Sequence, residues 1–253
     1  MGIRLILDSR LPGVVNMGRD EALLETVGAT GVPVLRLYGW SVPTLSLGYF
    51  QSAADRPLHP PSADCDWVRR STGGGAILHD EEITYSFCWP APPRGDLHVG
   101  YRWFHESLVR TLESLGIVAR RCPADQTQSP PPFLCFQRRA QGDLLIDNAK
   151  VGGSAQRRRH GAALQHGSVL WRRSPCAPEL PGIADLTDCP LTLDAFRESW
   201  IAELECSVES LVSSLGLPVA PRLAPSDWTE DEQARATQSI ETRFATAAWN
   251  EKR

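Results

Sequence analysis

Lysine is nearly absent from this chain of 253 residues. Of its 26 basic residues, 24 are arginine, and the two lysines are Lys150 and Lys252. Lys252 lies in the C-terminal tail, whereas Lys150 lies inside a glycine-rich stretch. Arginine and lysine differ in shape, in donor geometry and in how readily their pKa shifts. The exception at position 150 therefore indicates a place that needs an ammonium group.

Long hydrophobic runs and targeting signals are also missing. No run of about 18 apolar residues occurs, which excludes a membrane-spanning helix. The first thirteen residues have a short apolar stretch but lack the basic segment and the cleavage site of a signal peptide. We therefore expect a cytoplasmic protein with no membrane partner.

Cysteine pairs and nucleotide motifs are missing too. The seven cysteines are irregularly spaced, and none forms a Cys-x-x-Cys pair, which argues against a structural zinc site. An odd number without a secretion signal is typical of reduced thiols. The single triple glycine is not followed by Gly-Lys-Ser or Gly-Lys-Thr, so it is not a Walker A loop. We expect no metal site.

The composition is that of an ordinary globular protein, with 42% hydrophobic and 22% charged residues and a net charge of −4. The charge is unevenly spread along the chain. Residues 133–173 carry eight basic against two acidic residues, whereas residues 174–253 carry six basic against fourteen acidic. The basic block indicates an acidic partner, or alternatively a solvated strand edge.

The pattern of apolar residues predicts strands and helices in irregular alternation. Helices are expected over 16–27, 101–115, 194–215 and 230–249, with Asn16 as the N-cap of the first. Strands are expected over 3–7, 34–40, 44–47, 67–70, 76–78, 83–89, 133–136, 144–147 and 163–171. Because several strands follow one another directly, we expect an α/β or α+β fold with a mixed sheet.

Residues 69–80 have the sequence RRSTGGGAILHD. Three successive glycines lack Cβ atoms, so the backbone can approach a ligand closely and turn its N–H groups toward a carbonyl or a phosphate. The two arginines before them add positive charge. A flexible hairpin turn is the plainer interpretation, but the flanking Arg-Arg and His-Asp favour a ligand site.

A second glycine-rich stretch, residues 150–156, has the sequence KVGGSAQ, and residues 165–168 have the sequence QHGS. A cation followed by glycines suits a carbonyl oxygen or a phosphate. Ser154, Gln156 and Gln165 offer uncharged hydrogen-bonding groups that could orient a ligand. His166 alone is more often a structural histidine than a base.

Cys135 stands in the apolar stretch Phe-Leu-Cys-Phe. A cysteine in such a stretch is usually a small core residue. Lys150 and several arginines lie nearby in the sequence, however, and a neighbouring cation lowers the pKa of a thiol. A thiolate at this position would be an effective nucleophile toward a thioester.

Together these motifs resemble the catalytic domain that biotin and lipoate protein ligases share with the octanoyltransferases of lipoate synthesis. Residues 16–24 are similar to the first helix of the family, residues 48–51 to its G-x-F-Q turn and residues 249–250 to an element near its end. The resemblance implies a central mixed β-sheet flanked by helices, related to class II synthetase cores, in a single catalytic domain over residues 1–253. The TGGGA sequence replaces the GRGRxGR-type loop of the biotin branch, which disfavours that branch.

The resemblance also implies residue roles. Cys135 and Lys150 would be catalytic, and an acyl chain would lie in a slot beside the first glycine-rich stretch. The implied substrate-binding residues are Arg70, Thr72, Gly73, Gly74, Gly75, Ala76, His79, Gly152, Gly153, Ser154, Ala155, Gln165, His166 and Gly167.

Two activities are compatible with this family. Its octanoyltransferases hold octanoate on a cysteine in a Cys-Phe pair fifteen residues before the motif lysine, as Cys135 and Phe136 stand before Lys150. ATP-dependent lipoate-protein ligases instead form an acyl-adenylate and need ATP and Mg, and the stretch Gly142-Asp143-Leu144 resembles their N-D-L sequence. The spacing favours the transferase, which requires no cofactor.

The transferase interpretation implies two protein partners. Acyl carrier protein would donate the octanoyl group, and a lysine of a lipoyl-domain protein or of the glycine-cleavage H protein would accept it. The basic residues 157–159 are expected to guide a carrier. We expect a monomer with no nucleic-acid partner.

Overall fold

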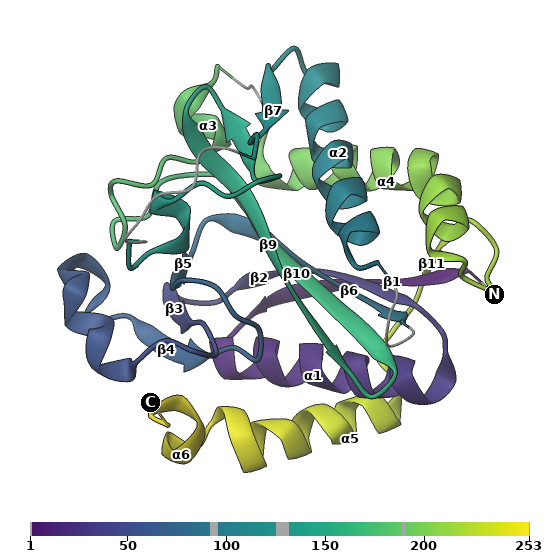
Figure 1. Ribbon diagram of the computed structural model, residues 1–253, viewed down its shortest axis with the longest axis horizontal. Helices are drawn as coiled ribbons and strands as arrows, with labels where there is room; N and C mark the ends of the chain where they lie inside the picture. Colours follow the sequence, from purple (N-terminus) through teal and green to yellow (C-terminus); the bar gives the residue numbers. More distant parts are fainter. Residues whose placement is uncertain (1, 92–95, 125–131, 189–190, 253) are drawn as a thin grey trace.

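The structure is a computed structural model that describes residues 2–91, 96–124, 132–188 and 191–252. Over this part of the chain, the larger sheet has the strand order β11-β1-β2-β6-β10-β9-β8-β7 (Figure 1). Its strands are β1 (Ile3–Leu11), β2 (Val34–Trp40), β6 (Glu82–Pro90), β7 (Ala119–Arg121), β8 (Leu144–Ile146), β9 (Ala149–Arg159), β10 (Ala162–Leu170) and β11 (Leu223–Pro225). Strand β1 pairs in parallel with β2 and β11, and the pairs from β2 to β7 are antiparallel. The predicted mixed sheet is confirmed.

A smaller sheet lies beside the larger one and carries the first glycine-rich stretch. Its central strand β3 (Thr44–Leu47) pairs in parallel with β4 (Asp66–Arg69) and antiparallel with β5 (Ile77–His79). The triple glycine forms the connection between β4 and β5. Two short 3-10 helices, η1 (Ala53–Leu58) and η2 (Pro60–Ser62), lie between β3 and β4.

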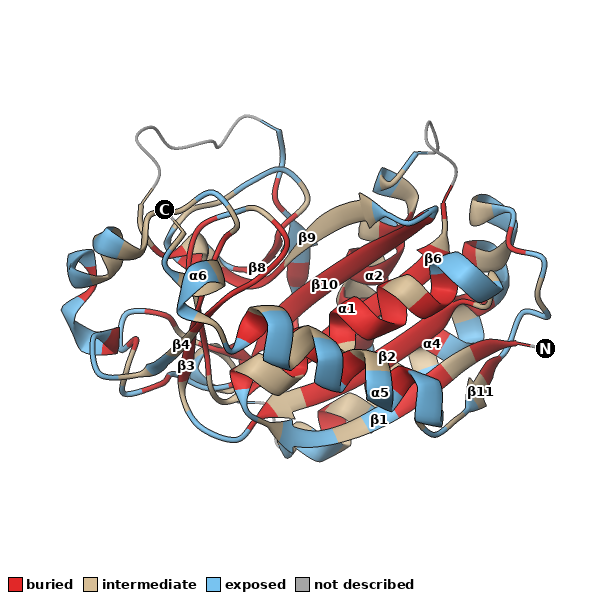
Figure 2. Ribbon diagram, turned by 90° about the horizontal axis from the view of Figure 1, so that it is seen from below, coloured by how far each residue is buried: buried red, intermediate tan, exposed pale blue. Residues whose placement is uncertain are grey.

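Helices cover both faces of the larger sheet (Figures 1 and 2). One face carries α1 (Gly13–Thr30), over which pack α5 (Glu230–Ser239) and the π-helical turn η4 (Ile240–Phe244), followed by α6 (Ala247–Asn250). The other face carries α2 (His98–Ser114) and α4 (Leu193–Leu215), which contact each other. The short α3 (Ile183–Leu186) precedes α4.

Side chains alternate between the two faces of the sheet along each strand, and this divides the core into two parts. In β6, the side chains of Ile83, Tyr85 and Phe87 belong to the cluster that includes α2 and α4, whereas Cys88 belongs to the cluster under α1. Successive side chains of a strand point to opposite faces, so a strand covered on both faces buries both sets of its side chains. This is why β6 and β10 are buried along nearly their whole length.

Helix boundaries correct two predictions. Helix α1 begins at Gly13 after Pro12, so the prediction that Asn16 is its N-cap is wrong. The Asn16 side chain instead donates to the carbonyl groups of Leu11 and Gly39. The single helix expected over 230–249 is divided, because a π-helical turn interrupts it between α5 and α6.

One prediction about the chemical motifs is also corrected, and one strand is added. Residues 133–136 do not form a strand: Leu134 makes one isolated bridge with Ala76, and the 3-10 helix η3 (Cys135–Gln137) follows. The second glycine-rich stretch lies in the long strand β9, which the sequence did not indicate because glycine is rare in strands.

The described residues bear on two expectations, those about membrane-spanning helices and about free cysteines. None of the helices in the described residues is both long and apolar enough to cross a membrane. Six cysteines are free thiols, and Cys189 lies outside the described residues.

The packing of Phe196 provides a test of the core under α4. Phe196 is completely buried, with its ring centroid 5.3 Å from that of Trp171. We expect Phe196→Ala to lower the free energy of unfolding by about 3–5 kcal/mol, because it removes apolar contacts and leaves a cavity. Urea denaturation followed by tryptophan fluorescence measures the change. Val118→Ala is the control, since Val118 is 84% exposed; equal effects at both positions would contradict this packing.

Candidate active site

A cavity lies where the two sheets meet. It encloses about 690 Å³ including its open mouth, within the roughly 300–1,000 Å³ typical of small-molecule sites. Strands β2, β5, β6, β9 and β10, helices α1 and α2, and the turn η3 all contribute to its lining. The predicted site residues that line it are Arg70, Gly73, Gly74, His79, Cys135, Lys150, Gly153, Ser154, Ala155, His166 and Gly167.

Cys135 is fixed at the first position of η3 by backbone bonds to Ala76. The amide of Cys135 donates to the carbonyl of Ala76 at 2.7 Å, and the amide of Ala76 donates to the carbonyl of Phe133 at 3.0 Å. The first glycine-rich stretch therefore holds the cysteine segment although 59 residues separate Ala76 from Cys135 in the sequence. Ala76 itself is fully buried and does not line the cavity.

Lys150 lies between Cys135 and a buried carboxylate. Its Nζ atom is 3.7 Å from the Sγ of Cys135, 3.4 Å from the carbonyl oxygen of the same residue and 2.8 Å from Oδ2 of Asp143. Both side chains of the ion pair are at most 4% exposed. A buried cation is costly unless it is paired, and Asp143 compensates Lys150 without displacing it from the thiol.

The thiol of Cys135 has a lowered pKa. Burial acts to raise it, but the positive charges of Lys150, Arg70 and Arg138 together outweigh burial and a smaller opposing effect of Asp143. Opposite charges nearby favour the ionised form of a titrating group. The lowered pKa favours the thiolate form of Cys135, which is the reactive form of a cysteine.

Arg70 organises the glycine-rich turn from within. Its guanidinium donates to the carbonyl groups of Ser46, Gly73 and Gly75 at 2.6–2.8 Å. Burial lowers the pKa of Arg70 to about 10. Gly74 adopts a φ of 96°, which side-chain-bearing residues rarely do, so this turn requires glycine.

Arg69, the other arginine of the pair, ties the turn to the C-terminal segment. Its amide donates to Oδ1 of Asn250 at 2.8 Å, and its guanidinium donates to the carbonyl of Asn250 at 2.7 Å. The indole of Trp249 donates to the carbonyl of Arg69 at 2.8 Å. Residues 249–250 therefore support the site from outside the cavity.

His79 lies in a buried polar cluster at the cavity wall. Its Nδ1 is 2.7 Å from Glu82 and its Nε2 is 2.8 Å from the Ser46 hydroxyl, while its ring stacks on Trp40. Burial lowers the pKa of His79, and the neighbouring Glu82 offsets this only in part. Both ring nitrogens are occupied by protein groups, so His79 shapes the wall of the cavity.

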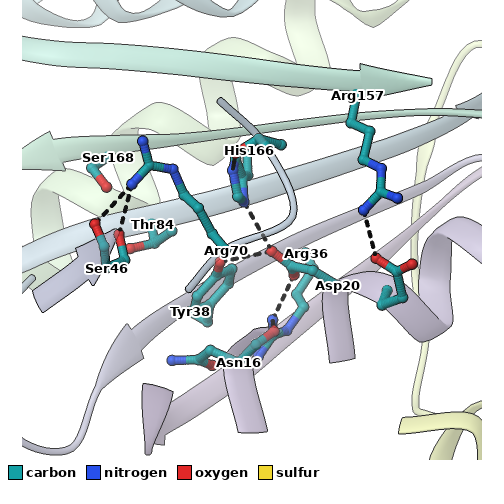
Figure 3. A network of polar contacts seen from close by, with 12 residues as sticks. Asn16, Asp20, Arg36, Tyr38, Ser46, Arg70, Thr84, Arg157, His166 and Ser168 are labelled. Atoms are coloured by element: carbon teal, nitrogen blue, oxygen red, sulfur yellow. Dashed lines mark hydrogen bonds and ion pairs between the residues drawn. The ribbon is translucent and has the colours of Figure 1, made fainter. Parts of the chain in front are cut away.

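His166 is also engaged at both nitrogens. Its Nε2 is 2.6 Å from the Thr72 hydroxyl and its Nδ1 is 3.3 Å from Asp20 (Figure 3). Burial acts to raise the pKa of Asp20, but His166 and the charge of Arg36 lower it overall. These contacts favour the structural interpretation of His166, which connects the glycine-rich turn to α1 through Thr72 and Asp20.

Comparison with known proteins identifies the family. The model described as "Lipoyl protein ligase A/B catalytic domain" matches residues 12–216. The octanoyltransferase LipM of Brevibacillus brevis is 30% identical, with 99% of each chain covered. That of Symbiobacterium thermophilum is 32% identical, with 98% of this chain and 97% of its own covered. The chain belongs to the lipoyl protein ligase A/B family.

Solved structures agree with the fold of this family. A lipoate-protein ligase A bound with ATP has a TM-score of 0.76 and is 24% identical over 99% of both chains. A bipartite lipoate protein ligase of Thermoplasma acidophilum, studied with its E2 lipoyl domain, has a TM-score of 0.74 and is 21% identical over 99% of this chain and 96% of its own. The predicted family and fold are confirmed.

Several residues assigned to substrate binding by resemblance lie behind the lining of the cavity. Thr72, Gly75, Gly152 and Gln165, like Ala76, do not line the cavity. Gln165 is fully buried and donates to the hydroxyl of Tyr85 at 2.6 Å. These residues are placed to hold the lining.

The structure adds residues that the sequence did not single out. Tyr101 and His105 stand one turn apart on α2; Tyr101 lines the cavity and donates to Asp143 at 3.2 Å. His105 lies 2.7 Å from the Ser154 hydroxyl and 2.5 Å from the carbonyl of Gly142. Burial lowers the pKa of His105 to about 4. Their spacing of four residues could have indicated that both side chains lie on one face of the helix. The apolar pattern around them drew attention to the buried face instead.

The basic residues 157–159, expected to guide a carrier, lie at the end of β9 and are partly exposed. Arg157 and Arg159 pair with Glu21 of α1 at 3.5 and 3.0 Å, and Arg243 joins them at 2.7 Å (Figure 3 shows the contact of Arg157). Three guanidinium groups thus share one carboxylate, which compensates only one of their charges. This cluster keeps a net positive charge.

Removing the charge at Lys150 tests the origin of the lowered thiol pKa. We expect Lys150→Met to raise the pKa of Cys135, because the largest favourable charge is lost. The pH profile of iodoacetamide alkylation at Cys135, followed by peptide mass spectrometry, should then move to higher pH. Lys252→Met removes the other lysine and should leave the profile in place. An unshifted profile in a Lys150→Met protein with native circular dichroism would refute the assignment.

Proposed function

We propose that this chain is an octanoyltransferase. It moves an octanoyl group from octanoyl-acyl carrier protein, through a thioester on Cys135, to a lysine of a lipoyl-domain protein or of the H protein. The observation that carries the proposal is the Cys135 thiol 3.7 Å from the Lys150 ammonium, in a cavity with apolar walls. The full-length likeness to octanoyltransferases supports it.

The first half-reaction forms the acyl-enzyme. The Cys135 sulfur attacks the carbonyl carbon of the donor thioester, and the oxygen takes up negative charge. Lys150 and backbone N–H groups of the glycine-rich segments stabilise this oxyanion. When the tetrahedral intermediate collapses, the bond to the donor sulfur breaks, and that sulfur leaves with the proton that Cys135 gave up.

The second half-reaction forms the amide. The uncharged amine of the acceptor lysine attacks the carbonyl carbon of octanoyl-Cys135, and the bond to the Cys135 sulfur breaks. The products are an octanoyl-lysine amide, the regenerated thiolate and one proton. Two easier steps thus replace one difficult transfer.

The proposed route uses no nucleotide and no metal, because a thioester is already activated. The alternative is an ATP-dependent lipoate-protein ligase that works through an acyl-adenylate. Asp143, the residue that suggested this alternative, binds Lys150 and the amide of Ala140 through Oδ2 and accepts from Tyr101 through Oδ1. These contacts give Asp143 a role in positioning Lys150. We also propose that the protein is cytoplasmic and monomeric.

The covalent intermediate is the decisive test. We expect the protein mixed with octanoyl-acyl carrier protein, without ATP or metal, to gain one hydroxylamine-sensitive octanoyl group, measured by intact mass. The adduct should be absent in Cys135→Ala and present in Cys88→Ala, a buried cysteine outside the cavity lining. No adduct, with acyl-adenylate formed from Mg-ATP and octanoate or lipoate, would establish the ligase instead.

The type of cation at position 150 is a second test. We expect Lys150→Arg to lower the rate of octanoyl transfer at least about tenfold, because a planar guanidinium does not reproduce the position of an ammonium. The space is also restricted: a Cβ atom at Gly153 would lie 2.7 Å from the Cε of Lys150. Single-turnover transfer from acylated enzyme measures the rate, and Lys252→Arg is the matched control. Full activity of Lys150→Arg would show that charge alone suffices.

A further inference from the structure

A second hollow lies beside the acyl cavity. It encloses about 1160 Å³ including its open mouth. Its lining comes from α2, β7, β9 and the segment before β8, and comprises His98, Tyr101, Arg102, Arg121, Gln141, Gly142, Ser154 and Gln156. Tyr101 and Ser154 also line the acyl cavity, so the two hollows share a wall. We call this second hollow the α2 groove.

The α2 groove is positively charged. Arg102 and Arg121 line it, and no carboxylate is found among the described residues of its lining. The nearest pairings are long and exposed: Arg102 to Asp96 at 3.7 Å and Arg121 to Glu106 at 3.4 Å. Exposed ion pairs of this kind contribute little and are readily exchanged for a better anion.

The start of α2 adds to this field. His98 is the first residue of the 17-residue helix and lines the groove. A helix N-terminus carries partial positive charge that favours anions. Asp96 accepts from the amide of His98 at 2.8 Å, which shows that this end already attracts a carboxylate.

Polar contacts connect the α2 groove to the nucleophile. Tyr101 donates to Asp143 at 3.2 Å, Asp143 pairs with Lys150 at 2.8 Å, and Lys150 lies 3.7 Å from the Cys135 sulfur. Because Tyr101 and Ser154 line both hollows, a donor arm that leaves the acyl cavity beside these two residues enters the groove. Gln141, Ser154 and Gln156 present amide and hydroxyl groups along that path.

We propose that the α2 groove binds the phosphate of a phosphopantetheine thioester donor, through Arg102 and Arg121. The inference rests on the proposed transferase function. Acyl carrier protein and coenzyme A both present their thiol on an amide-containing arm that ends in a phosphate. A planar guanidinium matches a phosphate well, and two of them flank the groove.

Four octanoyl thioesters test the proposal: those of pantetheine, 4′-phosphopantetheine, coenzyme A and acyl carrier protein. For the native chain, kcat/KM should be at least about tenfold higher with phosphopantetheine than with pantetheine, as expected for charge-assisted hydrogen bonds. In Arg102→Gln/Arg121→Gln this ratio should fall toward one. Arg110→Gln is the matched control, because Arg110 is on the same helix but pairs with Glu203.

The donors separate the possible outcomes. A double variant whose kcat/KM falls with phosphopantetheine, coenzyme A and acyl carrier protein alike supports the shared phosphate site. A higher kcat/KM of the native chain with acyl carrier protein than with the other donors identifies acyl carrier protein as the source of the phosphate. A fall in kcat/KM with acyl carrier protein alone would overturn the proposed phosphate site, since the arginines would then contact the carrier's surface. A native ratio near one would also overturn it. No transfer from any donor, and no adduct on Cys135, would instead refute the proposed function.

Discussion

The ion pair between Lys150 and Asp143 is the interaction on which the rest of the site depends. Both groups are buried, so neither would be tolerated alone, and together they hold a positive charge 3.7 Å from the Cys135 sulfur. Strand β9 supplies the lysine, while the segment before β8 supplies the aspartate. Because β8 and β9 are hydrogen-bonded neighbours in the sheet, their pairing fixes the charge in place before any substrate arrives.

The opposite wall of the site depends on a second set of buried contacts. Arg70 donates to the carbonyl of Gly73 within the glycine-rich turn, and Arg69 donates to the carbonyl of Asn250 in the C-terminal segment. The same turn holds Cys135 through Ala76. Cys135 is thus attached through Ala76 to the segment that leads into the small sheet, whereas Lys150 is part of the large sheet. Relative movement of the two sheets would change the distance between thiol and ammonium, which makes the packing between them part of the geometry of the site.

Much of this arrangement could be predicted from the sequence, for identifiable reasons. The mixed sheet followed from strands that are adjacent in sequence, and the placement of Cys135 beside Lys150 followed from their spacing and from resemblance. Contacts between distant residues could not be predicted. Asn16 was placed at a helix start because asparagine is a good N-cap, but tertiary hydrogen bonds to Leu11 and Gly39 use its side chain within the helix. Likewise, the apolar sequence around Cys135 suggested a strand, whereas the amides of Gln137 and Arg138 donate to the carbonyls of Leu134 and Cys135 and form a 3-10 turn.

The scarcity of lysine takes on meaning in this geometry. Elsewhere the chain uses arginine, whose fork-shaped guanidinium suits the multiple carbonyl contacts of Arg69 and Arg70. At position 150 the cation must meet Asp143, the Cys135 carbonyl and the Cys135 sulfur at once, beside a glycine that leaves no room for a Cβ. A compact ammonium with three donors can meet three partners in different directions, which a planar fork cannot do. The lysine at position 150 therefore fits the stereochemistry of this site.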